Sequence, residues 1–208
     1  LPGPAETPSG QSHTGPGGKG FNQATAAVRA GAPTTFVCAL GEDLGGQLAR
    51  ALATADGLDL REHSSGAPTG TAGIYVDDDG RNSIVIGPGA NADLPVAFVQ
   101  SQRDIVRDAR VLLAQLESPL PSIEAAFAIA RGAGVRTMLN PAPADAQVPA
   151  SLLALSDVIT PNETEFCAQL GRHVGERIDA ATVTAQGDEA LHAWCRRLLP
   201  HGTVVATL

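Results

Sequence analysis

The stretch Gly15-Pro16-Gly17-Gly18-Lys19-Gly20-Phe21-Asn22 is a glycine-rich segment that runs into a helical sequence. Glycine lets the backbone adopt positive φ and approach a ligand without an intervening Cβ. Lys19 adds a positive charge, and Asn22 adds an amide that donates and accepts hydrogen bonds. The alanine-rich run Gln23–Ala30 follows, and Gly31 is typical of the position after a helix. The segment predicts a binding loop for a small polar ligand, followed by a helix over 23–30.

Two standard nucleotide-binding loops are excluded by the sequence around this segment. The spacing Gly15-x-Gly17-x-x-Gly20 matches the dinucleotide fingerprint, which requires a buried strand immediately before it. The preceding residues 8–14 read PSGQSHT, and no hydrophobic core would bury them. A P-loop would need glycine at position 13 and serine or threonine at position 20, where this chain has His13 and Gly20.

Outward from this segment, apolar runs of strand length alternate with helical patterns. The predicted strands are Thr34–Leu40, Val111–Leu116, Val135–Leu139, Asp157–Thr160 and Thr203–Leu208. The predicted helices after the first are Leu44–Ala55, Ser122–Arg131, Ala150–Leu155, Glu163–Leu170 (ended by Gly171) and Asp188–Leu199. This alternation predicts an α/β protein whose parallel sheet is covered on both faces.

One segment, residues 69–87, departs from this alternation. Its two apolar stretches flank Asp77-Asp78-Asp79-Gly80, which predicts a β-hairpin. A solvated turn explains the acidic tip better than a calcium loop, which needs more widely spaced oxygen ligands and a terminal glutamate. A hairpin of this size needs a partner surface, so we expect it to form a small β lid together with Thr7–Thr14. The predicted division is a lid of residues 1–16 and 62–92, and a core of residues 17–61 and 93–208.

The composition limits the classes of partner. A formal net charge of −8 argues against nucleic acid or an anionic membrane surface, and no apolar run reaches the roughly 18 residues of a membrane span. The chain has 3 cysteines without a CxxC pair, which indicates reduced thiols in a cytoplasmic protein. The 5 histidines show no convergent spacing, and we expect them to be exposed to solvent.

Polar residues follow several of the predicted strands. Glu117 follows the strand 111–116, the segment Asn140–Ala144 follows 135–139, and Asn162 and Glu165 follow 157–160. Ligands of open α/β sheets bind outside the carboxyl ends of the strands, so these residues predict a cleft. Structural roles are also open. Asn162 with Glu165 resembles a capping box, Glu117 lies where a helix cap is expected, and Asn140–Ala144 reads as a rigid turn.

Four short motifs then carry a resemblance to a known family. They are GGKGFNQA at 17–24, QLESPL at 115–120, NPAPA at 140–144 and ITPNETE at 159–165. In this order and spacing they resemble the ribokinases, within the wider phosphofructokinase-B family of sugar kinases. The resemblance implies a three-layer, Rossmann-like α/β fold with a mostly parallel central sheet and a small β lid. It also implies ATP-dependent phosphorylation of D-ribose at the 5-hydroxyl.

The same resemblance implies the site residues, cofactors and partners. The implied sugar-binding residues are Gly18, Lys19, Gly20, Asn22 and Glu117. The implied nucleotide-binding residues are Asn162, Glu165 and Thr207, with Glu165 also ordering Mg²⁺ through water. The implied cofactors are ATP, Mg²⁺ and, in the complete enzyme, a monovalent cation such as potassium. The implied partners are the sugar, ATP and a second copy of the chain bound through the lid.

The sequence also departs from the family pattern. The family's N-terminal Asn-x-Asp strand and its C-terminal GAGD motif, whose aspartate is the general base, have no match among these residues. We therefore assign no catalytic residue, and we expect the chain to be part of a larger enzyme and inactive by itself. Phe21 stands where the family usually has alanine, which bears on the fit of the sugar. Two alternatives remain: another sugar or nucleoside kinase of the family, or a non-catalytic sugar-binding module. Ribose binding without ATP turnover would favour the module.

Overall fold

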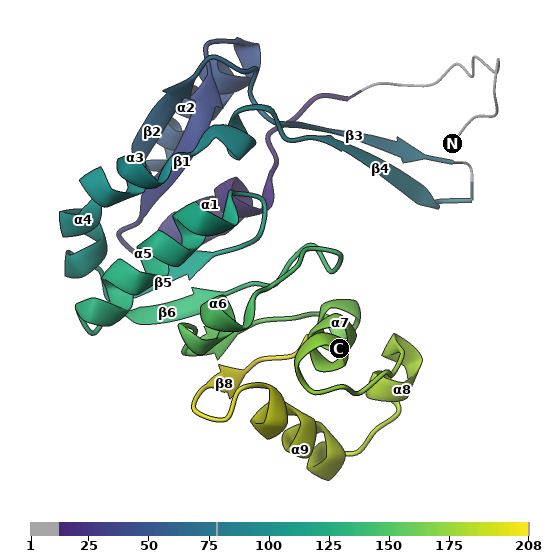
Figure 1. Ribbon diagram of the computed structural model, residues 1–208. Helices are drawn as coiled ribbons and strands as arrows, with labels where there is room; N and C mark the ends of the chain where they lie inside the picture. Colours follow the sequence, from purple (N-terminus) through teal and green to yellow (C-terminus); the bar gives the residue numbers. More distant parts are fainter. Residues whose placement is uncertain (1–12, 78, 208) are drawn as a thin grey trace. The chain divides into compact units, whose positions relative to one another are not determined.

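The computed structural model describes residues 13–77 and 79–207 (Figure 1). Contacts divide the chain between Asp93 and Leu94 into two compact units, which we call unit 1 and unit 2. Each unit is described by itself. Among the described residues, no helix has both the length and the apolar character needed to cross a membrane.

Unit 1 begins with an alternation of helices and parallel strands. Its first elements are α1 (Lys19–Arg29), β1 (Thr35–Gly41), α2 (Leu44–Asp56) and β2 (Asp59–Ser65). Strands β1 and β2 pair in parallel along their whole length, from Thr35 opposite Asp59 to Gly41 opposite Ser65. The predicted helix over 23–30 therefore starts four residues early, because α1 includes the end of the glycine-rich segment.

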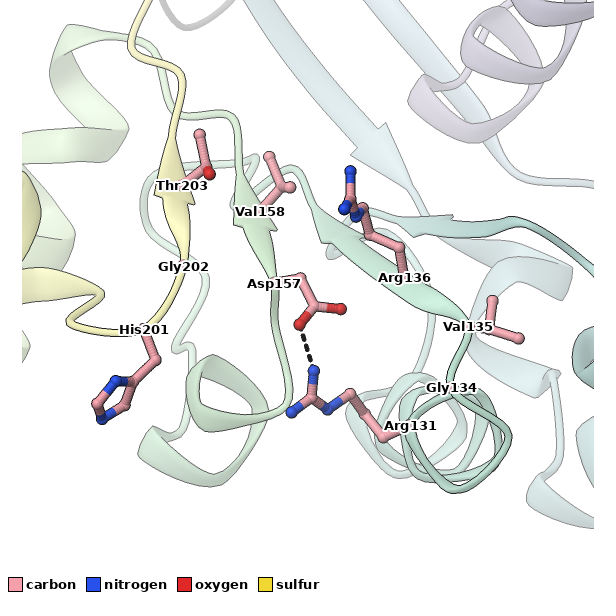
Figure 2. A pocket seen from close by; sticks show the side chains of 9 residues that line it. All are labelled: Arg131, Gly134, Val135, Arg136, Asp157, Val158, His201, Gly202 and Thr203. Atoms are coloured by element: carbon pink, nitrogen blue, oxygen red, sulfur yellow. Dashed lines mark hydrogen bonds and ion pairs between the residues drawn. The ribbon is translucent and has the colours of Figure 1, made fainter.

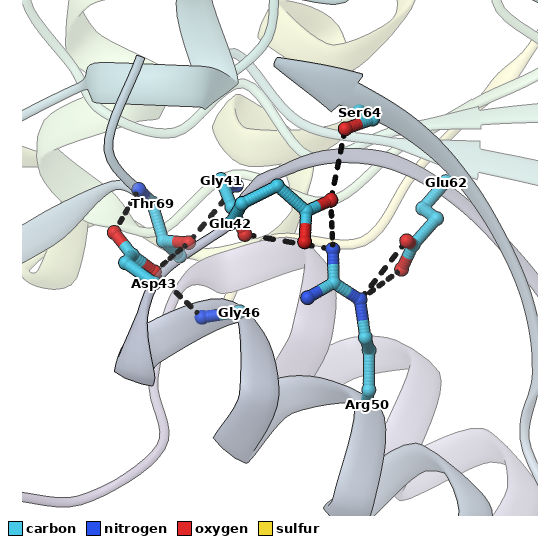
Figure 3. A network of polar contacts seen from close by, with 8 residues as sticks. All are labelled: Gly41, Glu42, Asp43, Gly46, Arg50, Glu62, Ser64 and Thr69. Atoms are coloured by element: carbon cyan, nitrogen blue, oxygen red, sulfur yellow. Dashed lines mark hydrogen bonds and ion pairs between the residues drawn. The ribbon is translucent and has the colours of Figure 1, made fainter. Parts of the chain in front are cut away.

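Strand β2 is strongly polar, and a charge network connects it with α2 (Figure 3). Arg50 on α2 donates from Nε to both carboxylate oxygens of Glu62 at 2.9 Å. Arg50 Nη2 also lies 3.2 Å from Glu42 Oε1, which accepts a hydrogen bond from Ser64 Oγ at 2.9 Å. These contacts offset the desolvation of Glu62. They give the polar side chains of β2 partners within unit 1.

The start of α2 is fixed to a distant segment by Asp43, its N-cap residue. Asp43 accepts from Gly46 N at 2.9 Å, from Thr69 N at 2.8 Å and from Thr69 Oγ1 at 2.7 Å (Figure 3). Thr69 Oγ1 in turn accepts from Gly41 N at 3.0 Å. The hydrogen bonds from Gly46 and Thr69 lower the pKa of Asp43 below its usual value. Asp43 therefore joins β1, α2 and the segment that leads to the next strand.

The predicted hairpin is confirmed as a separate two-stranded sheet of β3 (Thr71–Val76) and β4 (Asn82–Gly87). The strands are antiparallel, with Ile74 opposite Ile84. The turn is closed by Asp77 N donating to Arg81 O at 2.9 Å, and the Arg81 side chain pairs with Asp77 at 2.8 Å. The predicted companion segment lies, for residues 7–12, outside the described residues. Strand β2 crosses the predicted lid boundary between residues 61 and 62.

The base of the hairpin is built from glycines in close contact with backbone. A Cβ on Gly41 would lie 2.6 Å from Ala67 O, and one on Gly70 would lie 2.7 Å from Pro88 O. Gly89, which opens the short 3₁₀ helix η1 (Gly89–Asp93), has φ +47° and would direct a Cβ into Pro68 O. No larger residue fits these positions without moving backbone.

Unit 2 is an α/β unit around a parallel sheet of order β5-β6-β7-β8. Its strands are β5 (Val111–Ala114), β6 (Arg136–Leu139), β7 (Val158–Ile159) and β8 (Thr203–Val204). Its helices are α3 (Val96–Ser101), α4 (Arg103–Asp108), α5 (Leu120–Gly132), α6 (Ala150–Ala154), α7 (Glu163–His173), α8 (Ala180–Thr184) and α9 (Asp188–Leu198).

The main hydrophobic core of unit 2 lies between this sheet and its helices. Leu139 and Ile159 from the strands and Phe127 and Phe166 from α5 and α7 are fully buried. Trp194 on α9 packs against the same cluster with part of its surface exposed. Burial of these side chains is the dominant stabilising term for a unit of this kind.

Two details of α7 differ from the sequence-based prediction. The helix continues through Gly171 to His173, so Gly171 does not end it. His173 is half-buried rather than exposed, and its Nε2 is buried without a hydrogen-bond partner among the described residues. Burial, followed by the charge of Arg172, lowers the pKa of His173 below its usual value.

Candidate functional site

The carboxyl edge of the unit 2 sheet is shaped by prolines that follow its strands. Pro119, Pro141 and Pro161 come shortly after β5, β6 and β7. Proline has no N–H, so a strand that reaches it cannot extend its ladder of hydrogen bonds by that residue. Pro141 and Pro161 are among the fully buried side chains. Strands β6 and β7 therefore end at defined positions on one edge, each beside polar residues.

The loop after β7 carries the predicted pair Asn162 and Glu165 in a complete capping box. Asn162, the N-cap of α7, accepts at Oδ1 from Glu165 N at 2.8 Å, and Glu165 Oε2 accepts from Asn162 N at 3.0 Å. Glu165 is only 6% exposed. The structural alternative raised by the sequence is thus real. The box also holds a carboxylate rigidly at a helix N-terminus, on the edge where ligands of such sheets bind.

Thr207 lies next to this pair. It forms an isolated parallel bridge with Asn162, and its N–H donates to Pro161 O at 3.0 Å. The structure therefore brings the three predicted nucleotide-side residues together, from the exits of two neighbouring strands.

Glu117 follows β5 at a distance of three residues, because β5 ends at Ala114 and not at the predicted Leu116. Leu116 N donates to Ala142 O at 3.0 Å, which holds this segment beside the loop after β6. The Glu117 side chain is half-buried. It therefore belongs to the same edge of the same sheet as Asn162.

The other predicted sugar-binding residues lie in unit 1, at the start of α1. Gly18 is the N-cap residue and has φ 89°, a conformation that side chains rarely adopt. Lys19 and Gly20 open the helix, and Asn22 N closes its first turn on Gly18 O at 3.0 Å. Asn22 is exposed, whereas Lys19 is half-buried. The helix dipole disfavours a lysine at this end, so helix stability does not explain Lys19.

Phe21 has a structural role in unit 1. Its ring meets Phe36 edge-on, with centroids 6.1 Å apart and planes at 67°. It belongs to the apolar cluster formed by Ala24, Ala53 and Leu58. The departure from the family pattern at this position is therefore accommodated by packing within unit 1.

Thiols and metal-ligand clusters contribute little to the site. The three cysteines are free, and burial, followed by the charge of Glu62, raises the pKa of Cys38 to about 12. A thiol with this pKa stays protonated and is a weak nucleophile. Within residues 13–77 and 79–207, no three His, Cys, Asp or Glu side chains form a group that could hold a metal ion.

A hollow of about 450 Å³ lies at the opposite, amino edge of the unit 2 sheet (Figure 2). Arg131 pairs there with Asp157, whose Oδ2 accepts from Thr137 N at 2.8 Å. Burial opposes ionisation of Asp157, but the hydrogen bonds from Thr137 and Arg131 together lower its pKa. Because His201 and Arg131 line the hollow at the amino ends of the strands, it is separate from the polar exits described above.

The sequence left two interpretations open for Asn140, a place in the cleft and a part of a rigid turn, and the structure gives its side chain a specific contact. Asn140 Nδ2 donates to Thr160 O at 2.8 Å. The contact joins residues 20 positions apart in the sequence, so no local pattern identifies it.

A comparison with protein-family models identifies the class of protein. The chain matches the pfkB family carbohydrate kinase model over residues 5–195 and belongs to that family. Among curated proteins it is 41% identical to the ribokinase of Haemophilus influenzae over 180 residues, which cover 85% of this chain and 58% of that protein. It is 43% identical to a bifunctional ribokinase/ribose-5-phosphate isomerase A of Fructilactobacillus sanfranciscensis over 166 residues, 79% of this chain and 30% of that protein.

Solved structures agree with this assignment. The structure of Arabidopsis thaliana ribokinase complexed with ribose and ATP matches with a TM-score of 0.83 and 31% identity, covering 99% of this chain and 65% of that one. The structure of ribokinase from Giardia lamblia matches with a TM-score of 0.83 and 28% identity, covering 100% of this chain and 63% of that one. The chain thus has the ribokinase-like α/β fold and spans under two thirds of these relatives.

Proposed function

We propose that the protein containing this chain transfers phosphate from ATP to the 5-hydroxyl of D-ribose. The similarity to ribokinases and the four matched motifs support this activity. The observation that carries the proposal is the rigid cluster of Asn162, Glu165 and Thr207 at the carboxyl edge of unit 2. Phosphoryl transfer depends on positioning and on neutralising charge, and a preformed cluster of this kind supplies positioning.

The proposed sugar contacts come from two places in the sequence. Glu117 would accept hydrogen bonds from sugar hydroxyls, because a carboxylate is a strong acceptor. Lys19 and Asn22 would donate to the sugar, while Gly18 and Gly20 allow the backbone to approach it closely. The nucleotide is assigned to Asn162 and Thr207.

Magnesium is the metal that the family implies, and the donor chemistry of Glu165 is compatible with it. Mg²⁺ in kinase sites keeps several waters and is held by one or two carboxylates and by substrate phosphates. A buried carboxylate such as Glu165 would hold Mg²⁺ through water. Bound there, the ion would neutralise charge on the phosphates. A monovalent cation, proposed for the complete enzyme, is assigned to no residue of this chain.

Two further proposals concern assembly and location. The apolar hairpin strands support a homodimer formed through the lid, because Ile74 and Ile84 are more than half exposed. The free cysteines support a cytoplasmic, reducing location.

A coupled ADP-release assay with a panel of acceptors tests the activity. The complete protein that contains this chain is purified and, with ATP and Mg²⁺, is offered ribose, 2-deoxyribose, fructose and adenosine. We expect ribose to give the highest kcat/KM. A preference for another acceptor would instead support a different kinase of the family. Calorimetric binding of ribose without turnover of any acceptor would support a non-catalytic module.

A further inference from the structure

At the junction between β6 and the loop that follows it, a side-chain amide donates a hydrogen bond where the backbone has no N–H to donate. Strand β6 ends at Leu139, and the next residues are Asn140 and Pro141. Thr160 N donates to Leu139 O at 3.0 Å, which continues the pairing of β6 with β7 by one step. Pro141 has no N–H to donate in a further step.

The side chain of Asn140 supplies a donor at this point. Its Nδ2 donates to Thr160 O at 2.8 Å, while its backbone N donates to Ala114 O on β5 at 2.9 Å. Asn140 is half-buried. Without its amide, the carbonyl of Thr160 would lose a hydrogen-bond partner that water replaces poorly. One residue thus ties the exit of β7 to the ends of β5 and β6.

Thr160 leads directly to the capping box. Pro161 follows it with a restricted φ and accepts from Thr207 N at 3.0 Å. Asn162 comes next and forms the box with Glu165. A displacement of the Thr160 carbonyl would therefore be transmitted to Asn162 through a single rigid residue.

We propose that Asn140 is a positioning residue for the nucleotide side of the site, acting on Asn162 and Glu165 through its hydrogen bond to Thr160. The proposal rests on the proposed function for its consequence in ATP binding, but not for its structural part. It assigns Asn140 no contact with substrate.

The structural part is tested by amide hydrogen exchange without any ligand. Asn140→Asp keeps the side-chain size, removes the donor and places a carboxylate oxygen against a carbonyl. We expect the amides of Asn162 and Glu165 to exchange about tenfold faster, as loss of about one buried hydrogen bond implies, while amides of α9 are unchanged. The control Gln186→Glu makes the same chemical change at an exposed residue and should leave all of these amides unaltered. Faster exchange throughout unit 2 would indicate a role in general stability and overturn the proposal.

The functional part uses the affinity for Mg²⁺-ATP and its pH dependence. Asn140→Asp should weaken ATP binding about tenfold by the same reasoning and leave the Kd of ribose unchanged. Lowering the pH from 8 to 4 should bring the ATP affinity of Asn140→Asp closer to that of the wild type, because aspartate becomes protonated near its ordinary pKa of about 3.9 and then regains an O–H donor. Asn140→Ala has no such group, so its difference from the wild type should stay constant. Equal ATP affinity in the wild type and Asn140→Asp would overturn the proposal. A wild type that binds no ATP would instead overturn the proposed function, and hydrogen exchange would still decide the role of Asn140.

Discussion

Glu117 is the side chain on which the assignment of the sugar depends most directly. We expect Glu117→Ala to weaken ribose binding by about 2–4 kcal/mol, because hydrogen bonds to a charged carboxylate are the strong ones. Calorimetry on the folded variant measures the change. Glu189→Ala, in the exposed first turn of α9, is the matched control. Unchanged ribose affinity in Glu117→Ala would remove this residue from the site.

Asp157 determines part of the pH dependence of folding. Its folded pKa is lowered by hydrogen bonds from Thr137 and Arg131 that outweigh burial. A carboxyl group with a lowered pKa stabilises the fold above its unfolded pKa of about 3.9, and this contribution is lost as the pH falls through the folded pKa. Asp157→Asn should therefore lower the urea midpoint at pH 7, with a difference from wild type that shrinks below about pH 4.

Urea unfolding followed by circular dichroism measures these midpoints. Asp108→Asn, at the exposed end of α4, provides the comparison and should show little effect at either pH. A difference between wild type and Asp157→Asn that grows toward acid pH would contradict the assignment.

For single residues, the sequence predicts the contacts that are made with near neighbours in the chain. The capping box of Asn162 and Glu165 is a pattern of spacing three and could be recognised directly. The contacts of Asn140 with Thr160 and of Arg50 with Glu62 join residues far apart in the sequence, so no local pattern reports them. His173 is half-buried by packing that its immediate neighbours in the sequence do not reveal.

Helix α1 depends on the backbone conformation of Gly18. An alanine there would meet φ 89°, and residues forced into such regions cost about 1–3 kcal/mol. We expect Gly18→Ala to lower the free energy of unfolding by this amount. Gly17→Ala is the control, because a Cβ on Gly17 meets nothing within 4 Å. Equal thermal midpoints for the two variants would show that α1 can start without a glycine.

The hairpin provides the prediction about assembly. Pairing of β3 with β4 places Ala72, Ile74, Ile84 and Ile86 on one face, since residues directly opposite share a face. We expect Ile84→Glu to convert a dimer to a monomer, measured by sedimentation velocity, because burying an unpaired charge is costly. Ser83→Glu, on the other face, should leave the dimer intact. A wild type that is monomeric at high concentration would contradict the lid as the dimer contact.

Elements with a clear apolar pattern could be predicted, and elements without one could not. The hairpin and strands such as β6 follow from alternation and apolar runs. Strand β2 has no such run. Helix α8, with five residues, shows no helical period, whereas the equally short α6 could be predicted from its leucines. Helix α1 starts earlier than predicted because Gly20, which looks like part of a loop, forms part of its first turn.

At the scale of the whole molecule, the prediction concerns the turnover of ribose by this chain. The 208 residues contain no aspartate that matches the family's general base, and a missing base costs about 10²–10⁴ in rate. We therefore expect this chain, assayed by itself, to turn over ribose well below about 1 s⁻¹, the low end of typical kinase rates. Ribose-dependent ADP release near that rate would mean that another residue of this chain serves as the base.

The glycines at the base of the hairpin set its direction, while other residues, on the strands, form its exposed surface. Gly41, Gly70 and Gly89 leave no room for a side chain, so the attachment of the hairpin is set by backbone against backbone. The exposed apolar side chains of Ile74, Tyr75 and Ile84 lie further along the strands. The exposed side chains on the strands could therefore be substituted, in evolution or by protein engineering, while the direction in which the hairpin leaves unit 1 stays the same.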